Sequence, residues 1–388
     1  MLRFLLLLFA GFAAAATIGK LVPHVPWIAR ELGVSLAAAG FAVSAVMLPG
    51  ALLGPLVGLA ADRLGARRVA LAGIVLQALA SAAAGWAGSF AALVAARVIE
   101  GLGYSLAIVS ATVLVVQGAS RERQALALAV WSAFAPVGFA LGQLAAAPVS
   151  APNPLPWIGI AHALVLGACA LLVATLVQEA PKRTGPPPAF LAALRFAPAI
   201  RTAFAFGLAT AALLGAVALA PIALAATHGM SVATTAQWTA LAALPGIAGR
   251  FASGWLLAAA ARPIAVFAIA SVTGAAALAG SLASFMPFAA ALVCFSVFQI
   301  CIGALPGLMS AMLPRVAPSP GQLGTVSGLA NQMVTTGNLL APPLVLGMYA
   351  FGGTWAAAAA LVGAVALSAA LVAGLRVYRQ PLGRLTPP

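Results

Sequence analysis

The sequence predicts an all-α polytopic membrane protein, and three observations carry this prediction. Of the 388 residues, 64% are hydrophobic and only 6% are charged, whereas a soluble domain has roughly 25% charged residues. The apolar residues form long runs, most of them longer than the about 20 residues that a helix needs to cross a bilayer. Polar segments, many with Gly or Pro, separate these runs.

Twelve such runs follow one another along the chain, and each is expected to be a membrane-spanning helix. They are residues 3–29, 35–59, 69–87, 90–117, 125–148, 156–178, 202–226, 232–258, 263–284, 287–313, 324–350 and 354–376. The first run resembles a secretory signal peptide up to Ala16, but its apolar character continues through Val22. We therefore expect it to be retained as the first helix.

The net charge of +14 comes from 19 Lys and Arg against five Asp and Glu. Most of these cations fall in alternate loops and in the termini, and only Arg30 lies in a loop of the opposite side. By the positive-inside rule this distribution predicts cytoplasmic termini in a multi-pass protein of the inner membrane. It argues against nucleic-acid binding, which needs a basic soluble face.

A polar, proline-rich segment from Gln178 to Pro188 lies near the middle of the chain. It predicts an N-terminal six-helix bundle (residues 1–179), a cytoplasmic linker (180–201) and a C-terminal six-helix bundle (202–388). An internal repeat supports two related halves, because the Gly54-x3-Gly58 pattern that ends run 2 has a counterpart in Arg250-x3-Gly254 at the end of run 8. Two similar halves are a common plan of secondary carriers.

The loop after run 2 concentrates charge between two apolar runs, so it must lie in water at the membrane surface. Its pattern is Gly-x3-Asp-Arg-x-Gly-x-Arg-Arg, formed by Gly58, Asp62, Arg63, Gly65, Arg67 and Arg68. This pattern resembles the signature loop between helices 2 and 3 of the major facilitator superfamily. The stretch from Arg97 to Gly103 resembles the span 4 motif of the same family.

The resemblance implies a major facilitator fold, with twelve helices in two pseudo-symmetric halves, and secondary transport by alternating access. It implies that spans 1, 4, 7 and 10 line the substrate path. It also assigns the signature loop to a cytoplasmic gate, and places Arg250 of the Gly249-Arg250 pair as a brace of that gate. A weaker, general similarity is to bacterial permeases of the cyanate and nitroimidazole type.

Charged side chains inside spans are functional candidates, because each is costly in hydrocarbon unless it is paired or hydrated. Arg97 and Glu100 lie three residues apart, so they share one helix face and can compensate each other. This pair either serves transport or only satisfies itself. Lys20 has two alternatives: it faces the transport cavity if its helix continues to about Ala29, or it snorkels to the interface if the helix ends earlier.

The five carboxylates are distributed unevenly, and none lies beyond residue 179. Glu100 is therefore the one intramembrane acid that the sequence offers as a proton carrier, with His162 and His228 as poorer options. An anion bound to Lys20 and Arg97 would release Glu100 from its partner and favour its protonation. This is the mechanism that we expect for proton symport.

Several neutral polar residues complete the candidate site. In the second half, Gln299 and the stripe of Asn331, Thr335 and Asn338 either bind a ligand or bond a neighbouring helix. Tyr104 either walls the cavity or packs.

Two patterns predict close contacts between spans. Asp62 is expected to reach the N-terminal end of span 11 near Gly324 and Thr325, whose N–H groups attract an anion. Small-residue stripes predict close helix packing. They are Gly50-x3-Gly54-x3-Gly58, Gly138-x3-Gly142 and Gly303-x3-Gly307.

The sequence lacks the motifs of enzymes and ATP-driven pumps: it has one Asp, no P-loop and no Gly-x-Ser-x-Gly or His-Glu-x-x-His pattern. We expect no catalysis, no cofactor and no metal. The prediction is a monomeric secondary transporter in the lipid bilayer for a small, anionic organic solute, with protons as coupling ion. An efflux antiporter for lipophilic drugs or metabolites is the alternative, and a transporter-like membrane sensor is an alternative of another class.

Overall fold

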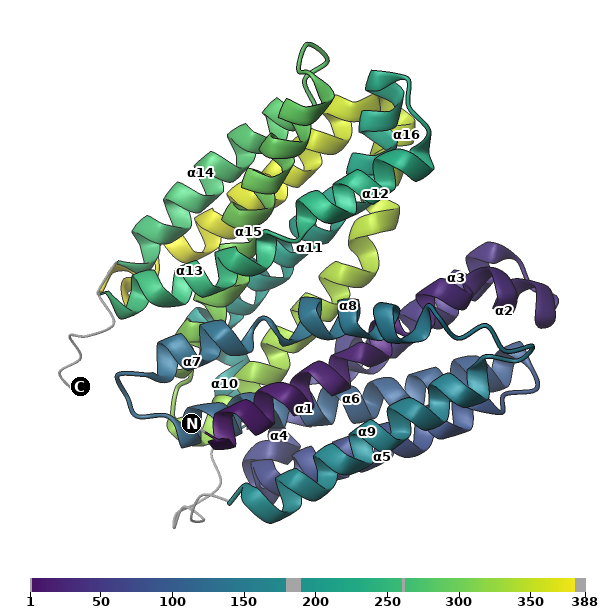
Figure 1. The fold of residues 1–388 in the computed structure, drawn as a ribbon. Coiled ribbons are helices and arrows are strands. Elements are labelled where there is room, and N and C mark those ends of the chain that lie inside the picture. Colours follow the sequence, from purple (N-terminus) through teal and green to yellow (C-terminus); the bar gives the residue numbers. More distant parts are fainter. Residues whose placement is uncertain (1, 179–189, 260–261, 381–388) are drawn as a thin grey trace. The chain divides into compact units, whose positions relative to one another are not determined.

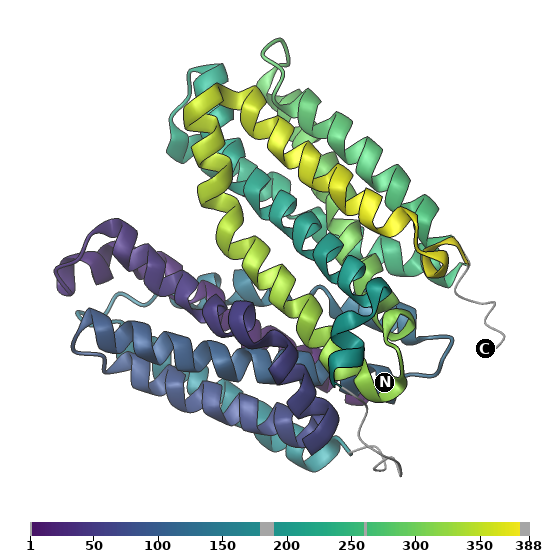
Figure 2. The same ribbon diagram turned by 180° about the vertical axis from the view of Figure 1, so that it is seen from behind.

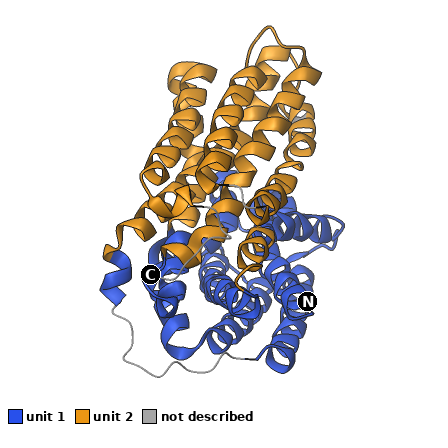
Figure 3. Cartoon of the chain, turned by 90° about the vertical axis from the view of Figure 1, so that its left-hand side faces the viewer, with its two compact units in different colours: residues 1–120, 133–194, 317–332 blue, residues 121–132, 195–316, 333–388 orange. Residues whose placement is uncertain are grey.

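The computed structural model describes residues 2–178, 190–259 and 262–380, and within these ranges all regular structure is helical (Figure 1). The chain divides into two compact units (Figure 3). Unit 1 contains residues 1–120, 133–194 and 317–332, and unit 2 contains residues 121–132, 195–316 and 333–388. Of the expected linker, residues 180–189 lie outside the described residues.

Unit 1 holds the first four spans, the sixth and most of the fifth. Its helices are α1 (Leu2–Gly19), η1 (Val22–His24), α2 (Val25–Glu31), α3 (Leu36–Ser44), η2 (Ala45–Met47), α4 (Leu48–Leu64), α5 (Ala66–Gly85), α6 (Phe90–Gly118), α8 (Phe134–Ala146), α9 (Leu155–Leu176), most of α10 (Phe190–Arg195) and η3 (Pro320–Gln322). The first ten residues of α16 (Leu323–Ala373) also belong to it. Inside the unit, α5 packs against both α6 and α9, and α1 packs against α8.

Unit 2 is built around α15, which packs against most of its other helices. The helices of the unit are α7 (Gln124–Trp131), α11 (Ala197–His228), α12 (Val232–Ala243), α13 (Gly246–Ala258), α14 (Pro263–Ser281), α15 (Phe288–Val316), the remainder of α16 and α17 (Arg376–Arg379). The main partners of α15 are α7, α11, α13 and α14, and it also contacts α12 and α17. Figure 2 shows the same helices from behind.

Eleven helical segments of the described chain are long and apolar enough to cross a membrane. The last of them, Pro320–Ala373, is 54 residues long and contains two of the expected runs. The helix is interrupted at Gly352 and Gly353, and Gly353 has a φ of +70°, a conformation that glycine adopts without strain. The twelve-span prediction is therefore confirmed, with two spans joined at a glycine turn instead of a loop.

Several spans consist of shorter helices with a proline at or near the junction. Pro49 lies in the first turn of α4, Pro136 in the first turn of α8, and Pro245 is the N-cap of α13. Proline has no N–H to continue the helical hydrogen bonds, so a new helix begins where it stands.

Arginines cap the C-terminal ends of several helices. Arg67 donates to the Ala174 carbonyl near the end of α9, and Arg250 donates to the Ser132 carbonyl at the end of α7, 2.9 Å away. Arg379 donates to the Ala373 carbonyl that ends α16. The last carbonyls of a helix carry partial negative charge, so a cation there is favourable. Part of the excess positive charge is thus compensated by peptide dipoles.

The predicted small-residue stripes form close helix contacts. A Cβ added at Gly58 would overlap backbone atoms of Gly324 in α16, and one at Gly142 would overlap the backbone of α1 at Ala16. In unit 2, a Cβ at Gly303 would overlap Gly246. These glycines let pairs of helices approach until their backbones touch.

Candidate functional site

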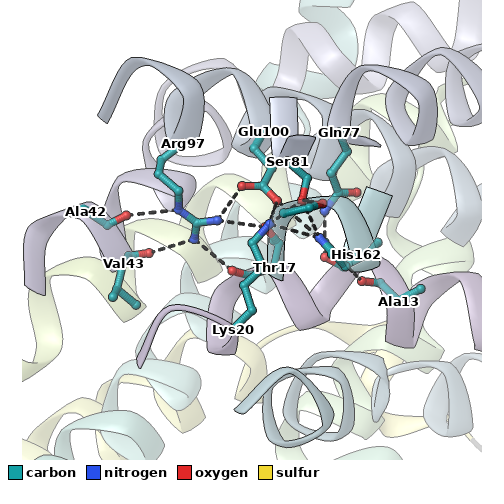
Figure 4. Close-up of polar contacts among 12 residues, drawn as sticks. Ala13, Thr17, Lys20, Ala42, Val43, Gln77, Ser81, Arg97, Glu100 and His162 are labelled. Atoms are coloured by element: carbon teal, nitrogen blue, oxygen red, sulfur yellow. Dashed lines mark hydrogen bonds and ion pairs between the residues drawn. The ribbon is translucent and has the colours of Figure 1, made fainter. Parts of the chain in front are cut away.

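Three ion pairs among the described residues of unit 1 lie in one buried group of polar side chains (Figure 4). Four ionisable residues form it, and we call them the charge cluster: Lys20, Arg97, Glu100 and His162. Lys20 follows α1, Arg97 and Glu100 lie on α6, and His162 lies on α9. Arg97 and Glu100 have no exposed surface, Lys20 is 3% exposed and His162 is 9% exposed.

Glu100 is the centre of the charge cluster. Its Oε1 lies 2.5 Å from Lys20 Nζ and 3.5 Å from His162 Nδ1. Its Oε2 lies 2.5 Å from Arg97 Nη1, which confirms the predicted contact along the helix. One buried carboxylate thus faces two cationic side chains and an imidazole. Such a group is stable in low dielectric only because it is paired and hydrogen-bonded.

Arg97 uses all five of its N–H donors. Nε donates to the Ala42 carbonyl, and Nη1 donates to Thr17 Oγ1 and Glu100. Nη2 donates to the carbonyls of Thr17 and Val43. The planar guanidinium therefore joins α6 to α1 and α3, a task that a lysine could not perform. In this conformation Arg97 has no donor left for a solute.

Of the two alternatives for Lys20, the one in which its ammonium snorkels to the interface is wrong. Helix α1 ends at Gly19, earlier than Ala29. The ammonium nevertheless turns inward, where it donates to Ser81 Oγ at 2.6 Å and to Glu100, and lies 3.1 Å from His162 Nδ1. The attraction of the buried Glu100 carboxylate outweighs hydration at the interface.

Hydrogen-bond geometry fixes the proton on one nitrogen of His162. Its Nε2 lies 2.8 Å from the Ala13 carbonyl, which only accepts, so Nε2 carries a proton. The lone pair of Nδ1 then accepts from Lys20, while Ser81 donates to the Gly159 carbonyl. The three hydrogens of the ammonium meet three acceptors. With His162 neutral, the charge cluster carries a net charge of +1.

Glycines allow the three helices around Glu100 to approach closely. A Cβ at Gly103 of α6 would overlap the backbone of Gln77 on α5, and one at Gly159 of α9 would overlap the Ser81 carbonyl of α5. The short distances bring side chains from three helices within hydrogen-bond reach. A core of buried apolar residues includes Leu21, which follows Lys20 directly, and Leu93, which lies one turn before Arg97 on α6.

Sequence reasoning did not identify Thr17, Gln77 and Ser81, and it ranked His162 low. All three of the missed residues are fully buried, and Gln77 donates to the Ala14 carbonyl while its Oε1 has no hydrogen-bond partner among the described residues. The usable signal was a polar residue within an otherwise apolar run. Gln77 and Ser81 also lie four residues apart, on one face of their helix.

The other candidate site residues are placed as follows. Tyr104 is buried on α6, one turn beyond Glu100. Gln299 is buried on α15 in unit 2, and its Nε2 has no partner among the described residues. Asn331, Thr335 and Asn338 lie on α16, with Thr335 buried and the two amides half-buried. These last four residues thus belong to helices other than those that carry the charge cluster.

The predicted contact of Asp62 is present within unit 1. Its Oδ1 accepts from the Gly324 N–H at 2.8 Å, and its Oδ2 accepts from the N–H and hydroxyl of Thr325, both at 2.7 Å. The carboxylate thus caps the first turn of α16, where the helix dipole favours an anion. Gly65 turns the chain between α4 and α5 with a φ of +100°.

The remaining residues of the predicted gate take three different positions. Arg67 caps α9 and Arg250 caps α7, as described above. Arg63 and Arg68 are exposed at the junction of α4 and α5. No three His, Cys, Asp or Glu side chains in the described ranges are grouped to hold a metal ion.

Fold and site together define a polytopic helical membrane protein with a buried, charge-paired centre. Residues 7–342 match the Major Facilitator Superfamily, and the chain belongs to this family. Members of the family are transporters. A comparison with curated proteins finds no match.

Solved structures of this family share the fold. The crystal structure of the human organic anion transporter MFSD10 (TETRAN) is 20% identical, with a TM-score of 0.74, and the match covers 95% of this chain and 99% of that chain. A bacterial homologue of the iron transporter ferroportin, in an outward-facing state, is 16% identical, with a TM-score of 0.76 and coverages of 96% and 98%. FucP in the outward conformation is 17% identical, with a TM-score of 0.73 and coverages of 96% and 98%.

Replacing Asp62 with asparagine tests the capping contact. The amide would keep the shape of the side chain but lose the charge that two N–H groups and a helix dipole favour, so we expect transport to slow several-fold while equilibrium solute binding stays nearly unchanged. The measurement compares solute exchange in liposomes with binding to detergent-purified protein. An equal loss of binding and exchange would show that Asp62 serves the binding site instead.

Proposed function

We propose that this protein is a proton-coupled secondary transporter of a small anionic organic solute, which works by alternating access in the cytoplasmic membrane with both termini inside. The observation that carries the proposal is the charge cluster, in which two cations share one carboxylate at full burial. The fold by itself does not select a solute, because the similar structures are named for an organic anion, for xylose and for iron.

The charges of the cluster explain why a proton and an anion would bind together. Lys20 and Arg97 are occupied by Glu100, so an anion can use them only when Glu100 lets go. Protonation of Glu100 removes its charge and frees both cations, but raises the net charge of the cluster from +1 to +2. Binding of a monovalent anion then returns the net charge of the cluster to +1. The loaded and empty clusters then have the same charge, which keeps the desolvation cost of the two states similar.

In this proposal Lys20 and Arg97 bind the anion and Glu100 carries the proton. His162 is the neighbour that exchanges protons with Lys20 across a distance of 3.1 Å. Tyr104, Gln299, Asn331, Thr335 and Asn338 are proposed to contact the solute in other steps of the cycle. The Asp62 contact, the signature loop and Arg250 are proposed to hold the cytoplasmic gate.

The decisive experiment measures thermal stabilisation of the purified protein by a panel of small carboxylates and inorganic anions at acidic and neutral pH. If one proton binds with the anion, affinity for the active anion should rise by up to about tenfold for each unit that the pH falls. Glu100→Gln imitates the protonated carboxyl, so we expect this variant to bind the anion with the same affinity at both pH values. Lys20→Met should bind at least about tenfold more weakly, since a buried charged contact is lost.

Glu31→Gln is the matched control, because Glu31 is an exposed acid at the end of α2. It should keep the pH dependence of the natural protein. Stabilisation by lipophilic cations, with none by any anion, would overturn the anion proposal in favour of the efflux antiporter. An anion whose binding is independent of pH in the natural protein would overturn the coupling alone.

A further inference from the structure

Unit 1 has a groove of about 460 Å³ where α4, α5 and α6 come together, away from the charge cluster. Two arginines and five apolar side chains line it. They are Ala60, Arg63 and Leu64 of α4, Arg68, Val69 and Ala72 of α5, and Leu106 of α6. The groove therefore combines a cationic part with an apolar part, and none of its lining residues is an acid.

The apolar part continues along both helices beyond the groove. On α4, Leu53 and Leu56 are exposed and lie on the same face as Ala60 and Leu64, at spacings of three and four residues. On α5, the exposed Val75 and Leu79 continue the line of Arg68 and Ala72 in the same way. In a membrane these two faces would contact acyl chains.

The cationic part lies at the turn between α4 and α5. Arg63 and Arg68 flank Gly65, which is the N-cap of α5 and has no side chain to cap the first turn. The positive end of the α5 dipole therefore adds to the charge of the two guanidinium groups. The positive-inside rule places this turn at the cytoplasmic surface.

We propose that the groove binds an anionic phospholipid of the cytoplasmic leaflet. Its phosphate would bind to Arg63 and Arg68, and its acyl chains would lie along the exposed faces of α4 and α5. The two arginines complement the negative charge of the phosphate, and the apolar walls continue from them along both helices. Basic pockets between spans on the cytoplasmic side suit anionic headgroups.

This site is separate from the contact that α4 makes with α16. Gly54 and Gly58, which touch α16, lie on the opposite face of α4 from Leu56 and Ala60, because the two pairs are about half a helical turn apart. A lipid and α16 would thus contact α4 on different sides. The proposal concerns a lipid and does not depend on which solute is transported.

The test places the protein in nanodiscs of phosphatidylcholine alone or of phosphatidylcholine mixed with phosphatidylglycerol. We expect native mass spectrometry to show phosphatidylglycerol retained in preference, and the melting temperature to be higher in the mixture. The preference for phosphatidylglycerol over phosphatidylcholine should weaken about fivefold in Arg63→Gln, and about fivefold again in Arg63→Gln/Arg68→Gln. This is the contribution expected of each basic residue at an anionic surface.

Arg121→Gln/Arg123→Gln is the matched control, because these two arginines are also exposed and lie in a different loop. It should keep the full preference for phosphatidylglycerol. Arg63→Lys/Arg68→Lys keeps both positive charges and should also keep this preference, which would show that the site tolerates substitution. The proposal is overturned if Arg63→Gln/Arg68→Gln, folded by its melting transition, retains phosphatidylglycerol as the natural protein does. It is also overturned if inorganic phosphate alone produces the same stabilisation.

Discussion

Glu100→Ala is expected to destabilise the protein by about 3–5 kcal/mol, the cost of removing one partner from a buried ion pair. The substitution leaves Lys20 and Arg97 buried without their shared carboxylate, so the net charge of the cluster rises from +1 to +2. The measurement is the free energy of unfolding in mixed micelles, followed by tryptophan fluorescence.

The double variant Lys20→Met/Glu100→Ala separates this charge effect from a simple loss of packing. It returns the net charge of the cluster to +1, so it should be more stable than Glu100→Ala, with a coupling energy of about 0.5–3 kcal/mol between the two positions. Glu31→Ala removes an exposed acid and should change stability by less than about 0.5 kcal/mol. If the double variant were less stable than Glu100→Ala, Lys20 and Glu100 would not be paired in the folded protein.

Gly58→Val is expected to abolish the contact between α4 and the start of α16. A side chain at this position would overlap the backbone of Gly324, and overpacking of this kind costs at least about 1–3 kcal/mol. The separated helices would also pull Asp62 away from the Gly324 and Thr325 N–H groups. We therefore expect a strong loss of transport, larger than that of Asp62→Asn.

Thiol labelling measures the separation directly. Ser327 is buried and lies one turn beyond Gly324, so Ser327→Cys in a background without the three native cysteines should label slowly. Adding Gly58→Val should speed the labelling at least about tenfold, because the contact that shields the thiol is lost. Gly167→Val is the control, since a Cβ at Gly167 meets open space. Equal labelling rates in both glycine variants would contradict the packing argument.

Local rules predicted much of this molecule from its sequence. The contact of Arg97 with Glu100 follows from helical spacing, and the anion preference of the first turn of α16, where Asp62 binds, follows from its free N–H groups. The spans follow from the lengths of the apolar runs. Each of these rules needs only residues close in sequence or a general property of a helix end.

The rest of the candidate site depends on contacts between distant segments. Lys20 meets Glu100 across 80 positions and His162 across 142, and no periodicity carries that information. The sequence alone does not decide where the Lys20 ammonium lies, because both water at the interface and a buried ion pair can stabilise its charge. The structure decides it through Gly103 and Gly159, which bring α5, α6 and α9 close enough for a shared polar centre.

The arginine caps at helix C-termini lead to a contrast in how the protein responds to acid. Peptide carbonyls gain no proton in ordinary buffers and arginine does not lose one, so the contacts of Arg67, Arg250 and Arg379 persist at any acidity that the membrane tolerates. A salt bridge to a carboxylate disappears once the carboxylate is neutralised. The arginine caps are thus insensitive to acid, whereas the charge cluster depends on the charge of Glu100.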